Sequence, residues 1–111
     1  MSETVNEAMR THRSALDLDG LADDLHKLEM QFRYIAFDLD RNAAEQLEDS
    51  DIEPERSVLY RSAANLAIRC RLSEIAKKLI EKGLAGNPPE PYKVALEELG
   101  GQVEQAMEGY Q

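Results

Sequence analysis

Residues 59–89 read LYRSAANLAIRCRLSEIAKKLIEKGLAGNPP, and the pattern of this stretch predicts two short helices. Its apolar residues recur three and four positions apart, which is the spacing of one face of an α-helix. The spacing predicts helices over about 54–71 and 73–85, joined by a turn so short that the two must lie antiparallel. Pro54 suits the first turn of the earlier helix, because its missing N–H has no intrahelical partner there.

Small residues lie where these two helices would cross. Alanine and glycine allow helix backbones to approach more closely than larger side chains do. We therefore expect the small residues on the facing sides to be buried, namely Ala63, Ala64, Ala76 and Gly83. Cys70 continues the apolar face of the first helix of the pair, so we predict a buried structural thiol rather than a reactive one.

A longer apolar stripe precedes the hairpin. Its residues alternate between spacings of four and three, and they are Leu21, Leu25, Leu28, Phe32, Ile35 and Leu39. This heptad-type spacing predicts a long helix over about 19–48, widened on its apolar side by Met30, Tyr34 and Phe37. The face exceeds what the hairpin can cover, so we expect it to cover the last helix or to meet a second copy in a homodimer. Residues 1–15 are polar and are predicted to form a flexible arm.

A fourth helix is expected over about 89–108, where apolar residues again recur three and four apart. Gly100 and Gly101 lie inside it, and each glycine costs about 1 kcal/mol relative to alanine in a helix interior. This pair indicates either a close contact with another helix or a bend, and we expect the close contact because small residues let backbones approach. Strand signals are weak throughout. The predicted fold is therefore all-α, a four-helix array or bundle with a long first helix and a central helix-turn-helix hairpin, in one domain over 16–111.

The hairpin resembles a tetratricopeptide unit over residues 57–89. That unit is a helix-turn-helix of about 34 residues with small residues at the crossing and a proline near its end. The matching positions are Ala63, Ala64, Ala76, Gly83, Leu84 and Pro88. The turn at 71–73 departs from the usual pattern, and no second copy follows, so the outer helices would cap one degenerate repeat. The pattern also resembles small bacterial proteins of unassigned role, which implies a fold and no activity.

The resemblance implies a candidate peptide-binding site on the first helix of the hairpin. Arg61, Asn65 and Arg69 are four residues apart and so share a face. In tetratricopeptide proteins the corresponding face lines a peptide groove, and some members hold a peptide carboxylate there with Lys, Asn and Arg side chains. Arginine suits this role because its planar guanidinium donates two hydrogen bonds to one carboxylate. The alternative is that the three residues are solvated or pair with acids of the first helix.

The sequence shows no catalytic signature, and its one suggestion of a metal site is incomplete. Asp23, His26 and Glu29 resemble half of a carboxylate-histidine site, but helical di-metal proteins need two such motifs and further inward glutamates. We therefore predict a surface histidine, and a protein that is not an enzyme and binds no metal or cofactor.

Charge and composition narrow the class further. The 111 residues carry a net charge of −9, which argues against nucleic-acid binding because phosphate recognition needs a basic surface. The charge is uneven, since residues 1–53 hold 14 acids and 5 bases whereas residues 54–89 hold 3 acids and 7 bases. No run of about 20 apolar residues could span a membrane. The single cysteine can form no internal disulfide, so a cytoplasmic location is expected.

Two functions fit these observations. The first is a non-catalytic protein–protein interaction module or small adaptor, which binds a peptide on the basic hairpin face or self-associates through helical faces. The second is an acidic inhibitor of the antitoxin type, whose acidic first helix and tail neutralise a basic protein. Neither function involves nucleic acid, a membrane or a cofactor.

Overall fold

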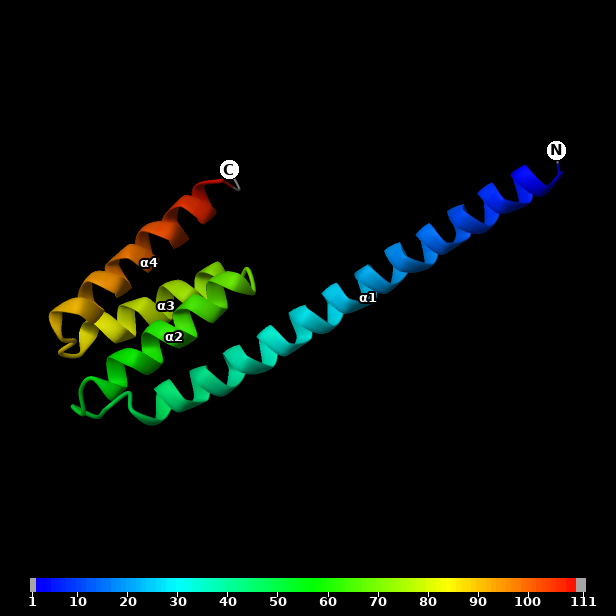
Figure 1. The fold of residues 1–111 in the computed structure, drawn as a ribbon. Helices are drawn as coiled ribbons and strands as arrows, with labels where there is room; N and C mark the ends of the chain where they lie inside the picture. Colours follow the sequence, from blue (N-terminus) through cyan, green and yellow to red (C-terminus); the bar gives the residue numbers. More distant parts are fainter. Residues whose placement is uncertain (1, 110–111) are drawn as a thin grey trace. The chain divides into compact units, whose positions relative to one another are not determined.

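A computed structural model describes residues 2–109, and this part of the chain consists of four α-helices (Figure 1). They are α1 (Ser2–Gln46), α2 (Glu55–Arg69), α3 (Ser73–Ala85) and α4 (Glu90–Glu108). Between residues 2 and 109 there is no strand. The prediction of an all-α, four-helix fold with a long first helix is confirmed. The chain divides into two units, Met1–Phe32 and Arg33–Gln111, whereas the sequence predicts one domain over 16–111.

The first helix begins at Ser2 rather than near residue 19. Its first turns carry no continuous apolar stripe, so the spacing of apolar residues does not predict a helix there. They do hold many good helix formers and neither glycine nor proline before Gly20, which is sufficient for helical backbone geometry. That residues 1–15 form a flexible arm stays a prediction.

Three helices of the second unit, α2, α3 and α4, lie side by side around a largely aliphatic core (Figure 1). All four small residues predicted at the helix crossing are buried, as expected: Ala63, Ala64, Ala76 and Gly83. A Cβ built on Gly83 would lie 3.1 Å from Tyr60 Cβ and 3.1 Å from Leu96 Cδ1. The backbone of α3 therefore contacts side chains of both α2 and α4 at a distance that only glycine allows without movement.

The glycine pair in α4 has a different role from the predicted one. A Cβ on Gly101 would meet nothing within 4 Å, and a Cβ on Gly100 would meet only Ile80 Cγ2, at 3.9 Å. The prediction that this pair marks a close helix contact is therefore wrong. The missing side chains leave open space beside α3 instead.

The turn between α2 and α3 is a Schellman-type helix end built on an arginine. Leu72 N–H donates to the carbonyl of Ala67 at 2.8 Å, and Arg71 N–H donates to that of Ile68 at 3.0 Å. Arg71 adopts φ 61°, the left-handed conformation that glycine usually supplies at this position. The turn thus satisfies the carbonyls at the end of α2 with a residue that is strained there.

Arg56 joins the ends of helices from within the second unit. Its side chain is only 4% exposed, and its guanidinium lies 4.8 Å from the centre of the Tyr60 ring. Nη2 donates to Lys82 O at 2.9 Å, Nη1 to Gly83 O at 3.4 Å and Nε to Glu48 O at 3.2 Å. The carbonyls of Lys82 and Gly83 belong to the last turn of α3, where they lack intrahelical partners and attract a cation.

Two further features hold this arginine in place. A Cβ on Gly86 would collide with the Arg56 guanidinium, so glycine directly after α3 lets this side chain keep its position. Lys82 Nζ also lies 3.1 Å from Glu48 Oε1, and this hydrogen bond raises the pKa of Lys82 above its ordinary value. The segment after α1 and the end of α3 are therefore joined in two ways. Backbone carbonyls of both accept hydrogen bonds from Arg56, and the Glu48 carboxylate pairs with Lys82.

Candidate functional site

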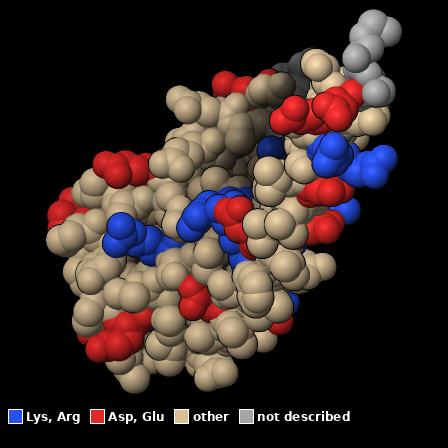
Figure 2. Space-filling model, turned by 45° about the vertical axis from the view of Figure 1, so that its right-hand side comes forward, with Lys and Arg blue, Asp and Glu red and all other residues tan. Residues whose placement is uncertain are grey.

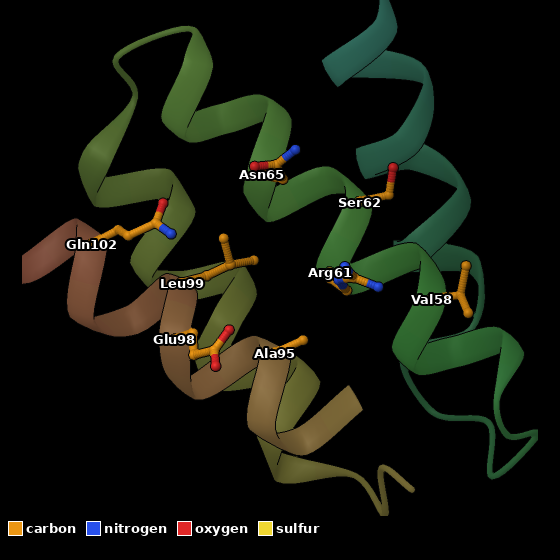
Figure 3. A pocket seen from close by; sticks show the side chains of 8 residues that line it. All are labelled: Val58, Arg61, Ser62, Asn65, Ala95, Glu98, Leu99 and Gln102. Carbon is orange, nitrogen blue, oxygen red and sulfur yellow. The ribbon is translucent and has the colours of Figure 1, made fainter. Parts of the chain in front are cut away.

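Two of the three predicted peptide-binding residues line the same surface hollow. Arg61 and Asn65 of α2 lie along one side of an open hollow of about 420 Å³ between α2 and α4 (Figure 3). The remaining lining residues are Val58, Ser62, Ala95, Glu98, Leu99 and Gln102. Arg69 is exposed outside this hollow. The structure therefore brings together a pair of the predicted residues, and whether they hold a peptide stays a prediction.

The hollow between α2 and α4 presents mixed chemistry. Arg61 supplies a positive charge and Glu98 a negative one from the opposite helix, so the hollow is not a simple anion site. The amides of Asn65 and Gln102 each offer a donor and an acceptor, as a polypeptide backbone requires. Ser62 donates a hydrogen bond to Asp40 of α1 and is thereby held at the hollow's edge. This arrangement suits a polar peptide segment better than an isolated carboxylate.

A second hollow, of about 390 Å³, lies between α3 and α4. Gly100 and Gly101 form part of its wall, and the apolar side chains of Ile80, Leu84 and Val103 lie at its base. Its remaining lining residues are Lys77, Glu81, Glu97 and Glu104, so the surroundings are predominantly acidic. The glycine pair is the sequence signal for this surface, although the same residues also suit close packing of two helices.

Most of the large apolar residues that are exposed among the described residues lie on α1, and the majority of these belong to the first unit. Every residue from 3 to 29 is exposed. Five large apolar residues of this unit follow heptad spacing on one face and are between 48% and 68% exposed, and we call them the seam: Leu18, Leu21, Leu25, Leu28 and Phe32. In the second unit Ile35 and Leu39 continue the spacing and are also exposed. The predicted stripe exists, and its large apolar residues are exposed in the structure.

Other residues of α1 pack within the second unit. Phe37 and Ala44, seven residues apart, are fully buried in its core. At 3.6 residues per turn they lie on the opposite side of the helix from Ile35 and Leu39. Of the residues expected to widen the apolar stripe, Phe37 is the one that is fully buried in the core. The stretch of α1 in this unit consequently has one face in the core and a second apolar face in solvent.

The remaining candidates from the sequence carry little chemistry. His26 is exposed and its Nδ1 lies 3.9 Å from Glu29 Oε2. Among residues 2–109 no group of three or more His, Cys, Asp or Glu is placed to hold a metal ion. Cys70 is half-buried against the core rather than buried, because it is the last residue before the α2–α3 turn. No helix of the described chain is both long and apolar enough to cross a membrane.

Charged residues of both signs are present on the surface of the protein. Figure 2 shows acidic and basic side chains scattered among uncharged residues on the face in view.

Comparison with known proteins adds no assignment, since no protein family, curated protein or solved structure matches this chain. The tetratricopeptide resemblance therefore stays a prediction, and the surfaces themselves are the basis for any function.

Proposed function

We propose that the protein is a non-catalytic interaction module that binds an α-helix of its partner on the seam of α1. The single observation that carries the proposal is the exposure of all five seam residues at heptad spacing. A contiguous apolar stripe in water is typical of an interaction surface. A stripe with alternate spacings of three and four is the shape that another helix fits, because its side chains pack into the gaps between those of the first helix.

The energetics of a lone helix support the same proposal. Most helical stability in proteins comes from packing an apolar face, and an unpacked helix is marginal in water. Full burial of one leucine side chain contributes about 1.5–3 kcal/mol, whereas an exposed ion pair contributes about 0.2–1 kcal/mol. The seam would therefore supply most of the affinity, and charged residues beside it would select the partner.

Peptide binding between α2 and α4 is a second candidate. The observation in its favour is that Arg61 and Asn65, predicted as peptide ligands, line one hollow with Glu98 and Gln102. A charge reversal, Arg61→Glu, should abolish binding of an acidic peptide there while leaving helix binding to α1 unchanged. A cytoplasmic location belongs to the same proposal as a further expectation, and self-association through the seam is the alternative that the peptide test below distinguishes from binding to another protein.

Helical peptides of about four heptads provide the test. Three peptides are mixed with the full chain: one with leucine at the core positions and lysine beside them, one with glutamate beside them, and one that copies residues 15–42. Binding is followed by fluorescence anisotropy of the labelled peptide. We expect at least one peptide to bind, and the variant Leu21→Gln/Leu28→Gln to lose that binding.

A matched control separates the seam from exposed apolar residues in general. Met9 and Leu16 are also exposed on α1 but lie off the seam, on another side of the helix. The variant Met9→Gln/Leu16→Gln should bind as the original protein does. If no peptide binds, or if both double variants lose binding equally, the seam is not a helix-binding site and the proposed function is wrong.

A further inference from the structure

We infer that the occupant of the seam is a helix of another protein, flanked by lysine or arginine, rather than a second copy of this chain. The inference rests on the proposed function and concerns the residues that border the seam. In a heptad labelled a to g, the seam residues take positions a and d. Position a holds Leu18, Leu25 and Phe32, and position d holds Leu21 and Leu28.

The bordering positions e and g beside the seam hold three acids, two uncharged residues and no base. Position g holds Asp17, Asp24 and Gln31, and position e holds Ala22 and Glu29. All five are exposed, so their charges lie where a bound helix would meet them. In coiled coils, residues at e and g face those of the partner helix and determine which partner is accepted.

The charged residues that border the seam do not stabilise a pair of two identical α1 helices. In a parallel pair, a g residue faces the e residue five positions later in the other copy, so Asp24 would face Glu29 of the second copy. Two-fold symmetry produces this repulsive contact twice, while Asp17 would face only an alanine. In an antiparallel pair g faces g, which places the aspartates of one copy along those of the other. Neither orientation of two identical chains forms one attractive bordering pair.

A partner helix with lysine or arginine at e and g reverses this balance. Each acidic border residue would then face a cation in either orientation, with the same apolar contacts in the seam. Opposite charges along an interface also speed association and disfavour wrong partners. The chemistry on α1 therefore fits an amphipathic helix with an apolar stripe between two basic borders.

The three peptides already described distinguish the occupants. We expect the lysine-bordered peptide to bind the full chain at least tenfold more tightly than the glutamate-bordered peptide or the copy of residues 15–42. The advantage should shrink at about 0.5 M salt, because salt screens exposed charges. A peptide of the same composition as the lysine-bordered one, with its leucines out of heptad order, should not bind.

Paired charge variants test whether the borders carry the selectivity. Asp17→Lys/Asp24→Lys reverses the g border, whereas Asp19→Lys/Asp23→Lys makes the same change of net charge away from the seam. Both variants also alter charge pairs along α1, so the helicity of each is checked by circular dichroism before binding is compared. We expect the border variant to bind the lysine-bordered peptide about tenfold more weakly and the control variant to bind it as before.

Each failure has a distinct meaning. If the copy of residues 15–42 binds as tightly as the lysine-bordered peptide, the occupant is a second copy, and the inference is overturned while the proposed function stands. If both charge variants weaken binding equally, the attraction is general and the borders select nothing, which also overturns the inference. If no peptide binds, the proposed function fails along with it.

Discussion

Replacing Gly83 with alanine should destabilise the protein, although alanine is the better helix former. In a helix interior the substitution by itself contributes about 1 kcal/mol of stability. Here the new Cβ would lie 3.1 Å from Tyr60 Cβ, an atom fixed to the backbone of α2, and 3.1–3.2 Å from both methyl groups of Leu96. Tyr60 and Leu96 are both fully buried, so neither has space to move into. Overpacking of this kind costs about 1–3 kcal/mol, which leaves a net loss of about 1 kcal/mol.

Gly101 offers the same substitution without the contact. Its Cβ would meet nothing within 4 Å, so Gly101→Ala should add about 1 kcal/mol to the free energy of unfolding. For a domain of this size about 1 kcal/mol shifts the melting temperature by about 5 °C. Thermal unfolding followed by circular dichroism should therefore place the two variants about 10 °C apart, on opposite sides of the original protein. A Gly83→Ala protein that melts as high as Gly101→Ala would refute the packing of α3 against α2 and α4.

Four further predictions concern Arg56, Arg71, Tyr60 and the backbone amides of α1. Arg56→Met should lower the free energy of unfolding by about 2–4 kcal/mol in urea titration, because three carbonyls lose their donor, whereas Arg61→Met at the exposed hollow should change it by less than about 0.5 kcal/mol. Arg71→Gly should raise it by about 1 kcal/mol, since glycine adopts φ 61° without strain. The Tyr60 hydroxyl is buried without a hydrogen-bond partner among the described residues, so Tyr60→Phe should leave stability equal or slightly higher at neutral pH. Burial raises the pKa of Tyr60 above its ordinary value of 10.0. The folded protein therefore keeps the phenolic proton to a higher pH than the unfolded chain does, so this contribution to the free energy of unfolding is complete below pH 10.0 and is lost as pH rises further. Urea titrations at increasing alkaline pH should show a shallower fall in the free energy of unfolding for Tyr60→Phe. Backbone amides of residues 3–29 should exchange hydrogen rapidly in the isolated chain and slow when a helix occupies the seam.

The hairpin could be predicted because its determinants are local. Helical spacing and a short turn fix two antiparallel helices, and the structure starts and ends them close to the expected residues. The role of each glycine was harder to predict. Gly83 admits two neighbouring side chains, whereas Gly101 leaves open space, and both have the same appearance in the sequence. Only the position of the other helices distinguishes a glycine that permits contact from one that leaves a hollow.

The apolar face of α1 likewise shows that the sequence does not reveal which residues a helix face contacts. Periodicity identifies which side of a helix is apolar, but it does not say what covers that side. Leu25 and Phe37 both belong to the predicted apolar region, yet the first is exposed and the second is buried. Phe37 is buried by packing within the second unit, and periodicity alone does not encode such long-range contacts.

The candidate site could be predicted in part. Arg61 and Asn65 share a helix face and line one hollow, as their spacing suggests. Arg69 lies eight residues from Arg61, which is about 12 Å along the helix axis, so it falls beyond the end of the hollow. The contribution of α4, Glu98 among others, depends on tertiary packing and had no signal in the sequence.

The bonds of Arg56 have a consequence for behaviour in acid. Its acceptors are the peptide oxygens of Glu48, Lys82 and Gly83, which do not take up protons in the ordinary range, and an arginine side chain stays charged throughout it. The neighbouring pair between Lys82 and Glu48 differs in kind, because its strength depends on the charge of a carboxylate. The guanidinium bonds should persist, leaving the end of α3 held by an attachment whose strength is nearly independent of acidity.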